Sequence, residues 1–527
     1  MRAETTDDLF ARYGPAYKWF AMVTGMLGGT TAILASSTVN VAFPDIMGAF
    51  GIGRDQAQLL STGYFASTTA GMLVSAWLIA SFGERMTYIG VLVTFLIGSA
   101  TSGLAHNTET LMIGRVMQGM AAGVIQPLGM AVTFSVFPSG RKGLSMGLYS
   151  MGMVLAPTLG PTAGGLAIEL FNWRYVFLLT LPTTALSIIL GYLFMPSREM
   201  PKKLPRFDFL AFLFLCVALV GFLLGFSYGN RLGWTSNEIL GFFTAAAVAT
   251  TGFIHRQLYG SAPFINLALF KNAQFVAACC IALFAGFAFL SSTFMLPLFV
   301  QQIQHYTPFD AGMMMMPGGL SLLILYPLTG RLADACPPHV LIYIGLISFG
   351  LAFIFLATAD VNTPFWTIVS FTILIRGGTA FTRPVTNTAA LRSLPPELLN
   401  QGSGAINLMR QLGAVIGTNG LVVFLELRIP FYGDAFAAMQ TAASRTSLEM
   451  RESIIRLLTE AGVPPIARGP GALHYLGDVI YAQASTLGFQ DAFMTLGIIT
   501  LAGLLPAWVM SVTQKGQPLL LRRRRVL

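Results

Sequence analysis

MAVTFSVFPSGRKGLSMGLYS at residues 130–150 aligns with NTAALRSLPPELLNQGSGAIN at residues 387–407, at an offset of 257 residues. AWLIASFGER at 76–85 aligns with GRLADACPPH at 330–339 at an offset of 254. The first offset also matches prolines and glycines in pairs: Pro127 and Pro384, Pro138 and Pro395, Gly147 and Gly404, and Gly160 and Gly417. A near-constant offset over so many positions predicts two similar halves in the same orientation.

The composition indicates what surrounds these halves. Hydrophobic residues make up 54% of the 527 residues and charged residues only 10%, whereas a soluble domain carries about 25% charged residues. Apolar runs of roughly 18 to 26 residues recur along the chain, and about 20 residues suffice to cross the hydrocarbon core as a helix. Membrane strands would instead show weak alternating segments of about ten residues. We therefore expect an all-α polytopic membrane protein.

The apolar runs predict fourteen transmembrane helices. They lie at 19–43, 58–81, 87–105, 110–136, 144–168, 175–195, 208–229, 238–255, 275–300, 311–333, 339–358, 364–388, 402–425 and 489–513. Corresponding spans of the repeat lie eight helices apart in the chain. We therefore expect six helices in each half and two further helices inserted between the halves. The expected organisation is a cytoplasmic segment at 1–18, an N-terminal six-helix bundle at 19–195, a linker with two additional helices at 196–274, a C-terminal six-helix bundle at 275–513 with an outer loop at 426–488, and a basic tail at 514–527.

The net charge of +9 is expected to report topology and not nucleic-acid binding. With the N-terminus inside, the segments on that side hold 19 of the 31 Lys and Arg residues, including the tail with RRRR at 522–525. The short outer loops hold three and the loop at 426–488 holds five. Because basic residues concentrate on the cytoplasmic side of membrane proteins, both termini are predicted to be cytoplasmic.

Four arginines fall inside the expected spans, on stripes of polar residues at helical spacing. The stripes contain, in order, Arg115, Gln118 and Gln126; Arg376, Arg383 and Asn387; and Asn407 and Arg410. A charged side chain in the bilayer core is costly, so such residues face the interior of a bundle or a wet cavity. We expect the three stripes to line one path. The alternative that each arginine is a structural tie to carbonyl groups of a neighbouring helix stays open.

Two further patterns concern movement. The span at 144–168 carries residues that break backbone hydrogen bonds or lack bulk, namely Pro157, Gly160, Pro161, Gly164 and Gly165. Such residues let a helix bend and let a neighbour approach, so they predict a conformational hinge, although tight packing alone would also use them. The loops after the second and tenth spans are expected to clamp helix ends on the cytoplasmic side in one state. Their candidate gate residues are Gly83, Arg85, Gly330, Arg331 and Asp334.

Several ordered motifs resemble one known family. They are LMIGRVMQGMAAG (111–123), MGMVLAPTLGPTAGG (151–165), NWRYVFLLTLP (172–182), TPFDAGMMMMPGGL (307–320), GRLAD (330–334) and GAINLMRQLGAVIGTNG (404–420). The chain resembles a major facilitator superfamily transporter of the fourteen-helix drug:proton antiporter type, the EmrB/QacA group. The resemblance implies multidrug efflux by alternating access, coupling to protons and a place in a bacterial inner membrane.

The chain departs from the family pattern at acidic positions. In LASSTVNVAFP (34–44), Ala35 stands where the family has an acid, and Ala76 and Ala80 stand where the family has Gly and Asp. Ser36, Ser37 and Asn40 therefore predict a neutral polar patch that binds substrate or water, with hydrogen bonding between helices as the alternative. The remaining candidate proton carriers lie near outer helix ends: Glu109, Glu169, Asp310 and Glu426.

The sequence predicts a secondary active exporter and no enzyme. The five His residues form no cluster at metal-ligand spacing, and no Gly-rich phosphate loop is present, so no metal, cofactor or ATP is expected. Four buried arginines without a buried carboxylate predict small amphipathic substrates with an anionic or neutral end. A facilitator without proton coupling, a lipid or metabolite transporter of the same fold, and a non-transporting membrane protein remain alternatives.

The loop at 426–488 is too long for a simple connection. Its stretch TSLEMRESIIRLLTEAG (446–462) predicts an amphipathic helix, with Met450, Ile454, Leu457 and Leu458 as its apolar stripe. Such a helix must cover its apolar face. It either folds over the transporter's own mouth or docks a periplasmic adaptor protein that continues to an outer-membrane channel, a partner that the resemblance implies.

Overall fold

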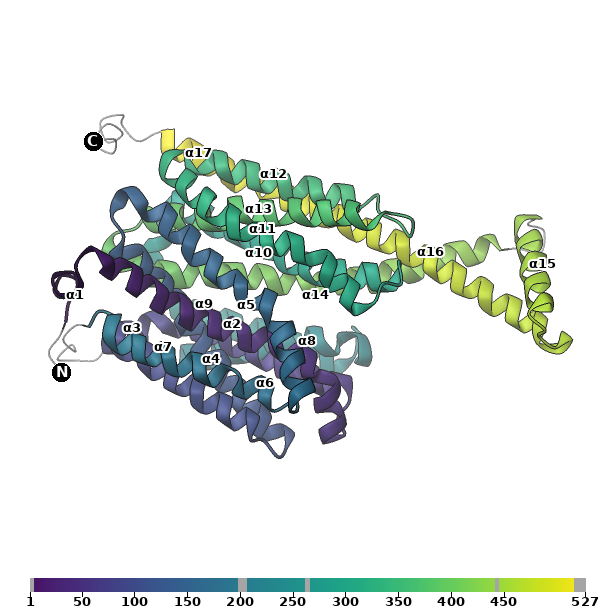
Figure 1. Cartoon of the computed structure of the whole chain (residues 1–527), viewed down its shortest axis with the longest axis horizontal. Helices are drawn as coiled ribbons and strands as arrows, with labels where there is room; N and C mark the ends of the chain where they lie inside the picture. Colours follow the sequence, from purple (N-terminus) through teal and green to yellow (C-terminus); the bar gives the residue numbers. More distant parts are fainter. Residues whose placement is uncertain (1–3, 198–205, 261–265, 441–444, 516–527) are drawn as a thin grey trace.

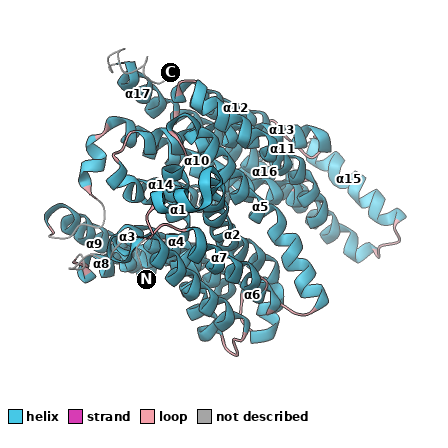
Figure 2. Cartoon of the chain, turned by 60° about the vertical axis from the view of Figure 1, so that its left-hand side comes forward, coloured by secondary structure: helices cyan, strands magenta, loops and turns pink. Residues whose placement is uncertain are grey.

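The computed structural model describes residues 4–197, 206–260, 266–440 and 445–515. Every regular element within these ranges is a helix, and Figure 2 shows helices throughout (cyan). The long helices run side by side in two groups, with both ends of the chain at one end of the molecule (Figure 1). The all-α fold expected from the sequence is confirmed.

The N-terminal half follows a short amphipathic helix, α1 (Thr6–Tyr13). Its helices are α2 (Tyr17–Phe50), α3 (Arg54–Gly103), α4 (Thr108–Val136), α5 (Lys142–Leu170), α6 (Tyr175–Leu178) and α7 (Thr180–Phe194). The C-terminal half holds α10 (Ala273–Gln302), α11 (Pro308–Ala335), α12 (Pro338–Leu356), α13 (Phe365–Arg392), α14 (Leu399–Met439), α16 (Pro465–Ala502) and α17 (Leu504–Lys515). Two inserted helices, α8 (Phe209–Leu232) and α9 (Asn237–Tyr259), lie between the halves in the chain.

Helix α3 contains two of the expected spans. It turns back at Gly83, whose φ of 77° and ψ of 171° are outside the helical region. The Thr87 hydroxyl donates to the carbonyl oxygen of Leu78 at 3.0 Å, although nine residues of straight helix would separate them by about 13 Å. By length and composition, twelve helical stretches of the described chain qualify as membrane spans. The number fourteen stays a prediction.

The inserted pair is attached to the N-terminal half. The rings of Trp77 on α3 and Phe207 lie 4.7 Å apart at their centroids. Asp208 accepts two hydrogen bonds from Arg256, at 3.0 and 2.9 Å, and caps α8 by accepting from the backbone N–H of Ala211 at 3.0 Å. The hydrogen bonds from Arg256 lower the pKa of Asp208 below its usual value. The pair therefore closes the α8–α9 hairpin at the end near the chain termini.

The expected loop at 426–488 is largely helical. Helices α14 and α16 continue past the bundle and form an arm that ends in α15 (Arg445–Glu460), at the far end from the termini (Figure 1). At the base of the arm, Asp491 accepts hydrogen bonds from Arg428 and Tyr432, both at 2.8 Å. Ile454 of α15 is 5% exposed. Because α15 packs on α16 at the tip of the arm, it does not fold back over the outer end of the bundle (Figure 1).

The hydrophobic cores show where the halves meet. Near the arm, one core lies wholly in the C-terminal half, around Phe299 and Phe353, and another wholly in the N-terminal half, around Trp173 and Phe177. Near the termini, a single core joins Met146 and Tyr149 of α5 to residues of the C-terminal half. In the described chain the halves are thus packed together at the terminal end, and their cores separate toward the arm.

Candidate functional site

The terminal end is closed by two seams that the sequence repeat relates. At the first seam, α5 meets α11: a Cβ on Gly147 would lie 2.3 Å from the carbonyl oxygen of Tyr326. At the second seam, α14 meets α3: a Cβ on Gly404 would lie 3.2 Å from the carbonyl oxygen of Met72. The offset of 257 pairs Gly147 with Gly404, and the offset of 254 pairs Tyr326 with Met72. The first seam is the tighter one.

Asp334 locks the first seam. Its carboxylate accepts hydrogen bonds from the backbone N–H groups of Gly143 at 2.7 Å and Leu144 at 2.9 Å, across the two halves. These N–H groups belong to the first turn of α5. The first turn of a helix has N–H groups without partners inside the helix and carries a partial positive charge. Arg392 forms an ion pair with the same carboxylate. Gly330 completes the contact, because a Cβ there would lie 2.7 Å from the carbonyl oxygen of Gly143.

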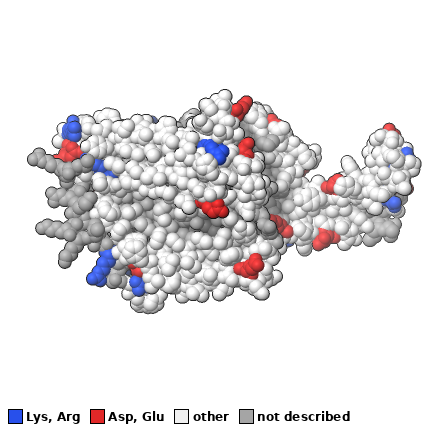
Figure 3. All heavy atoms as spheres, turned by 90° about the horizontal axis from the view of Figure 1, so that it is seen from below, with Lys and Arg blue, Asp and Glu red and all other residues white. Residues whose placement is uncertain are grey.

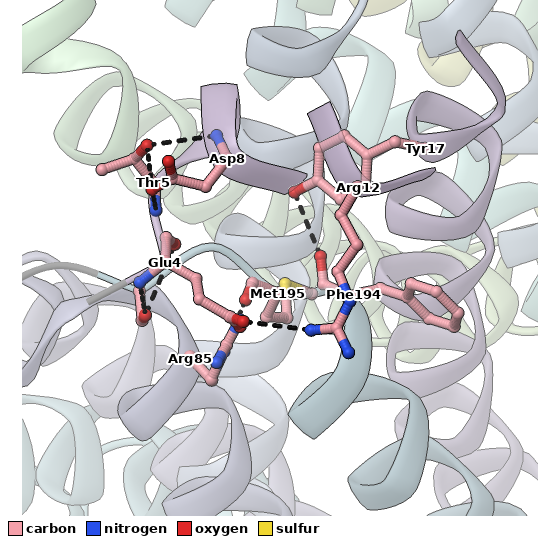
Figure 4. A network of polar contacts seen from close by, with 9 residues as sticks. Glu4, Thr5, Asp8, Arg12, Tyr17, Arg85, Phe194 and Met195 are labelled. Atoms are coloured by element: carbon pink, nitrogen blue, oxygen red, sulfur yellow. Dashed lines mark hydrogen bonds and ion pairs between the residues drawn. The ribbon is translucent and has the colours of Figure 1, made fainter. Parts of the chain in front are cut away.

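A second charged gate candidate, Arg85, holds helix ends together within the N-terminal half and not across a seam. Arg85 donates to the carbonyl oxygen of Met195 and to the Glu4 carboxylate, both at 2.7 Å, so it ties α3 to the end of α7 and to the N-terminal segment (Figure 4). The clamp expected from Gly83 and Arg85 therefore lies inside one half. The reason is the turn at Gly83, which directs Arg85 away from the seam. Arg331 is exposed.

The second seam lacks an acid equivalent to Asp334. The repeat places Ala80 at that position, and the start of α14 has no capping hydrogen bond from a side chain at its N-cap. Among the described contacts of α14 with the N-terminal half, the Asn400 amide donates to the Glu84 carboxylate at 3.4 Å, and the Ser403 hydroxyl donates to the carbonyl oxygen of Pro127 at 2.8 Å. The gate is thus asymmetric, with its charged lock on the first seam.

We predict that Gly147→Ala prevents closure at the first seam. The added Cβ would press on the Tyr326 carbonyl oxygen, and overpacking of this kind costs about 1–3 kcal/mol. The transport rate in proteoliposomes should fall about tenfold, as for a shift of 1.4 kcal/mol. Gly140→Ala is the matched control, since nothing lies within 4 Å of its Cβ. Equal rates for the two variants would contradict the prediction.

A polar pocket lies between the halves just beyond the closed end. The N-terminal half contributes Gln126, Met130, Tyr149, Ser150 and Met153, and the C-terminal half contributes Arg383, Asn387, Asn407 and Arg410. Its volume of ≈ 10 Å³ is close to the space that one water molecule needs. The structure thus brings Gln126 of the first expected stripe together with Arg383 and Asn387 of the second and Asn407 and Arg410 of the third.

Arg410 is fixed at the centre of this pocket. Its Nη1 donates to the Asn407 amide oxygen at 2.8 Å, and its Nη2 donates to the Asn387 amide oxygen. The Asn407 amide in turn donates to the carbonyl oxygen of Ser403 at 2.8 Å. Arg383 also lines the pocket, and no Asp or Glu is among the described residues that line it. The pocket is therefore suited to a negatively charged or polar group.

Arg115 and Gln118 lie elsewhere, inside the N-terminal half. Arg115 is fully buried and donates to the carbonyl oxygen of Ala35 at 3.2 Å and to the amide oxygen of Gln118 at 3.0 Å. Its guanidinium also lies 4.3 Å from the ring centroid of Tyr64. The single path expected for all three stripes is thus divided, and Arg115 matches the alternative of a structural tie, because carbonyl and ring groups of its own half surround it.

Arg376 is likewise placed outside the polar pocket. Its Nη1 and Nη2 approach the Thr293 hydroxyl at 3.4 Å, and its guanidinium lies 4.9 Å from the ring centroid of Phe289. Both partners belong to α10 of the same half. Arg376 therefore joins two helices of the C-terminal half.

The polar patch of α2 packs against α5. The Ser36 hydroxyl donates to the carbonyl oxygen of Ile33 at 2.7 Å, and the Ser37 hydroxyl donates to that of Leu34 at 3.0 Å. A Cβ on Gly160 would lie 2.0 Å from the Ser37 hydroxyl oxygen. The side chain of Asn40 lies outside the described part. The Ser36 hydroxyl thus bonds within α2, whereas the Ser37 hydroxyl also reaches the carbonyl oxygen of Ala156 on α5 at 3.5 Å, a bond between helices. Binding of substrate or water by this patch stays a prediction.

The proposed hinge residues occupy a continuous helix. Helix α5 runs from Lys142 to Leu170 through Pro157 and Gly165. A Cβ on Gly164 would lie 3.1 Å from the carbonyl oxygen of Thr38, so this face packs closely on α2. The side chain of Pro161 is not among the described ones. Bending of α5 stays a prediction.

None of the four candidate proton carriers lines the pocket: Glu109, Glu169 and Asp310 lie at the ends of helices, whereas Glu426 lies within α14, which continues to Met439. Glu109, Glu169 and Glu426 are exposed. Asp310 accepts a hydrogen bond from Thr307 at 2.7 Å at the start of α11. In the part of the chain that the structure describes, no group of three or more His, Cys, Asp or Glu side chains could hold a metal ion.

Of the N-terminal wall of the pocket, sequence reasoning found Gln126 and missed Met130, Tyr149, Ser150 and Met153. Tyr149 donates to the carbonyl oxygen of Gln126 at 3.0 Å, and Met130 contacts the Asn407 amide through its sulfur at 3.4 Å. The available signal was spacing: Tyr149 and Met153 are four residues apart and share a face of α5. Neither is charged, so neither stood out among apolar residues.

Comparison with known proteins agrees with this architecture. The family model described as Major Facilitator Superfamily matches residues 25–418. The chain is 29% identical over 490 residues to the uncharacterized MFS-type transporter YhcA of Bacillus subtilis, covering 92% of this chain and 91% of that protein. It is 27% identical over 390 residues to the multidrug export protein EmrB of Haemophilus influenzae, covering 73% and 76%.

Solved structures show the same fold at low sequence identity. The proton:xylose symporter XylE superposes with a TM-score of 0.61 at 13% identity, over 94% of this chain and 96% of that one. The human organic anion transporter MFSD10 superposes with a TM-score of 0.60 at 12% identity, over 94% and 99%. Two repeated halves closed around a polar pocket, together with a family match over most of the chain, lead to one conclusion: the chain belongs to the Major Facilitator Superfamily.

Proposed function

We propose that the chain is a secondary active transporter that exports amphipathic compounds with an anionic or neutral polar end by alternating access. The observation that carries the proposal is the pair Arg383 and Arg410 in the pocket between the halves, with no carboxylate among its described lining. A buried cationic pocket attracts anions and repels lipophilic cations. The relatives named as multidrug export and lincomycin resistance proteins support efflux as the direction.

The arrangement of the halves supports an outward-facing state. Lys and Arg concentrate toward the end with the termini, while Asp and Glu predominate near the arm (Figure 3). By the positive-inside tendency, the terminal end is cytoplasmic and the arm is outside. The seams at Gly147 and Gly404 then close the pocket toward the cytoplasm. This assignment also makes both termini cytoplasmic.

The test is a comparison of substrates in proteoliposomes. We expect a labelled bile acid or fatty acid to be transported, and ethidium, a cation, to be transported much more slowly. Transport of ethidium with no transport of the acids would contradict the anionic preference while retaining the transporter. No transport of either would favour the non-transporting alternative.

Proton coupling is the second part of the proposal. The pocket offers no described carboxylate, so the carriers would be Glu109, Glu169 or Asp310 at helix ends, or Glu426 within α14. An imposed pH gradient across inverted vesicles should drive uptake of the acid. Uptake that does not respond to the gradient would favour a facilitator or a lipid or metabolite transporter of this fold, which Ala35 in place of the family acid also favours.

We further propose that the arm docks a periplasmic adaptor protein that leads to an outer-membrane channel, with the chain in the inner membrane of a double-membraned bacterium. The arm extends beyond the bundle and exposes large apolar side chains: Leu457 is 62% exposed, Ile466 90% and Tyr481 64%. Large apolar side chains exposed on a segment outside the bundle suit a binding partner.

Deletion of residues 440–470 is predicted to separate two activities. It should abolish resistance to an acidic amphiphile in cells and leave the transport rate in proteoliposomes within about twofold of the native chain, since the base of the arm is held by the Arg428–Asp491 pair. Equal loss in cells and proteoliposomes would instead make the tip part of the transporter's own fold.

A further inference from the structure

A second pocket lies at the terminal end of the N-terminal half, away from the seams. Its volume is ≈ 560 Å³. Phe10, Pro15 and Lys18 form one wall, and Val136, Phe137 and Pro138 at the end of α4 form the other. None of the transport steps described above uses it.

The N-terminal segment builds one wall and holds it in place. Helix α1 ends at Gly14, whose φ of 62° turns the chain toward α2. The ring of Phe10 packs edge-on against that of Tyr17, at 4.9 Å between centroids. The Glu4 carboxylate binds Arg12 at 3.1 Å and Arg85 at 2.7 Å (Figure 4). The wall is therefore anchored to the bundle.

Lys18 is the unusual side chain of this pocket. It is half-buried, and among the described residues no hydrogen bond or ion pair is formed by its ammonium group. The described lining contains no Asp or Glu. A second ammonium, that of Lys142, lies 4.2 Å from the ring centroid of Phe134, one turn of α4 before Phe137. A half-buried cation between apolar walls is stabilised by an anion.

The pocket is next to the surface that faces lipid. The Trp19 ring lies edge-on to the ring of Phe137, at 5.3 Å between centroids. Trp19 is 39% exposed, and Phe20 and Val23, which follow it on α2, are each 42% exposed. Tryptophan is enriched where a membrane meets water, and exposed apolar residues of a membrane helix contact acyl chains. A lipid molecule can therefore reach the pocket sideways.

We propose that this pocket binds one anionic phospholipid of the surrounding bilayer. Its phosphate would meet Lys18, and an acyl chain would lie along Phe137 toward Trp19. Basic pockets at the cytoplasmic ends of membrane helices suit such head groups. A zwitterionic head group brings its own ammonium, which Lys18 repels. The cytoplasmic placement rests on the orientation under the proposed function, whereas the binding chemistry does not.

The test counts lipids bound to the full-length chain. Native mass spectrometry of the detergent-solubilised protein is compared after titration with dioleoylphosphatidylglycerol or with dioleoylphosphatidylcholine. We expect the first adduct to form at about fivefold lower concentration with the anionic lipid, as one lysine near an anionic surface contributes about that much. Lys18→Gln should remove the preference. Lys271→Gln removes an exposed lysine at the start of the C-terminal half and should keep it.

Ser135→Phe provides a second variant that keeps both lysines. Ser135 is exposed and lines the pocket, so a phenylalanine there should fill it and weaken the first adduct with either lipid. Equal binding of the two lipids by the native chain would overturn the proposal, as would a preference that survives Lys18→Gln or a first adduct that Ser135→Phe does not weaken. Because the assay measures no transport, its failure is distinct from a failure of the proposed function.

Discussion

Arg410→Gln is expected to lower the export of an acidic amphiphile about 30-fold. Arg410 lies between the halves, where Asn387 and Asn407 hold its guanidinium through their amide oxygens. Losing a buried charge that pairs with a charged ligand costs about 2 kcal/mol or more, which corresponds to about 30-fold in affinity. Glutamine still donates to one of the two amide oxygens, so the fold should persist. The measurement is the initial transport rate of a labelled bile acid in proteoliposomes.

Two comparisons decide how the result is interpreted. Arg451→Gln removes the same charge from an exposed position on α15 and should leave the rate within about twofold of the native rate. Arg410→Gln should lower the transport rate of a neutral amphiphile much less than that of the acidic one. Equal losses for both substrates would show that Arg410 acts on structure, and an unchanged rate for the acid would remove the pocket from the transport path.

Asp334→Ala is expected to open the end that carries the termini. The carboxylate satisfies two backbone N–H groups at the start of α5 and pairs with Arg392. A buried donor left without a partner costs about 1–3 kcal/mol, so the balance between closed and open states should shift at least tenfold toward open. Asp334→Ala removes the acceptor that these part-buried N–H groups have in the closed state.

Spin labels can measure that opening directly. Arg141→Cys and Glu397→Cys place labels on exposed residues of the two halves at this end, in a chain whose four native cysteines are replaced. The distance between the labels should lengthen with Asp334→Ala and change less with Asp334→Asn, which keeps an acceptor oxygen. Asp310→Ala, at the other end of α11, is the control. An unchanged distance with Asp334→Ala would mean that the shared hydrophobic core and the seam glycines hold the halves closed without this carboxylate.

The sequence by itself determined the class of fold. Apolar runs of helical length required a membrane protein, because a membrane-crossing backbone must satisfy its own hydrogen bonds. The repeated prolines and glycines, such as Pro138 with Pro395 and Gly147 with Gly404, required two halves of one orientation. These features can be predicted without a structure because each reflects a local constraint. The length of an apolar run reflects the thickness of the hydrocarbon, and a repeated glycine or proline reflects a backbone that must approach another closely.

Helical spacing also placed the polar residues on faces, but it did not assign those faces to neighbours. Arg115 and Arg410 have the same sequence signature, an arginine on a polar stripe inside an apolar span. The structure buries Arg115 among carbonyl groups of its own half and puts Arg410 between the halves. Both environments offer hydrogen-bond acceptors to a guanidinium inside the membrane. The polar stripe in the sequence therefore cannot distinguish an arginine within one half from an arginine between the halves.

Tertiary structure alone decided three features: which arginines face the pocket, which seam carries the charged lock, and how far α14 and α16 extend. The lock depends on Asp334 reaching the first N–H groups of α5, a segment 190 residues away in the chain. The arm depends on helices that continue after their apolar runs end. Hydropathy reports where a helix leaves the hydrocarbon and not where it ends, and spacing reports a helix face and not the neighbour packed against it.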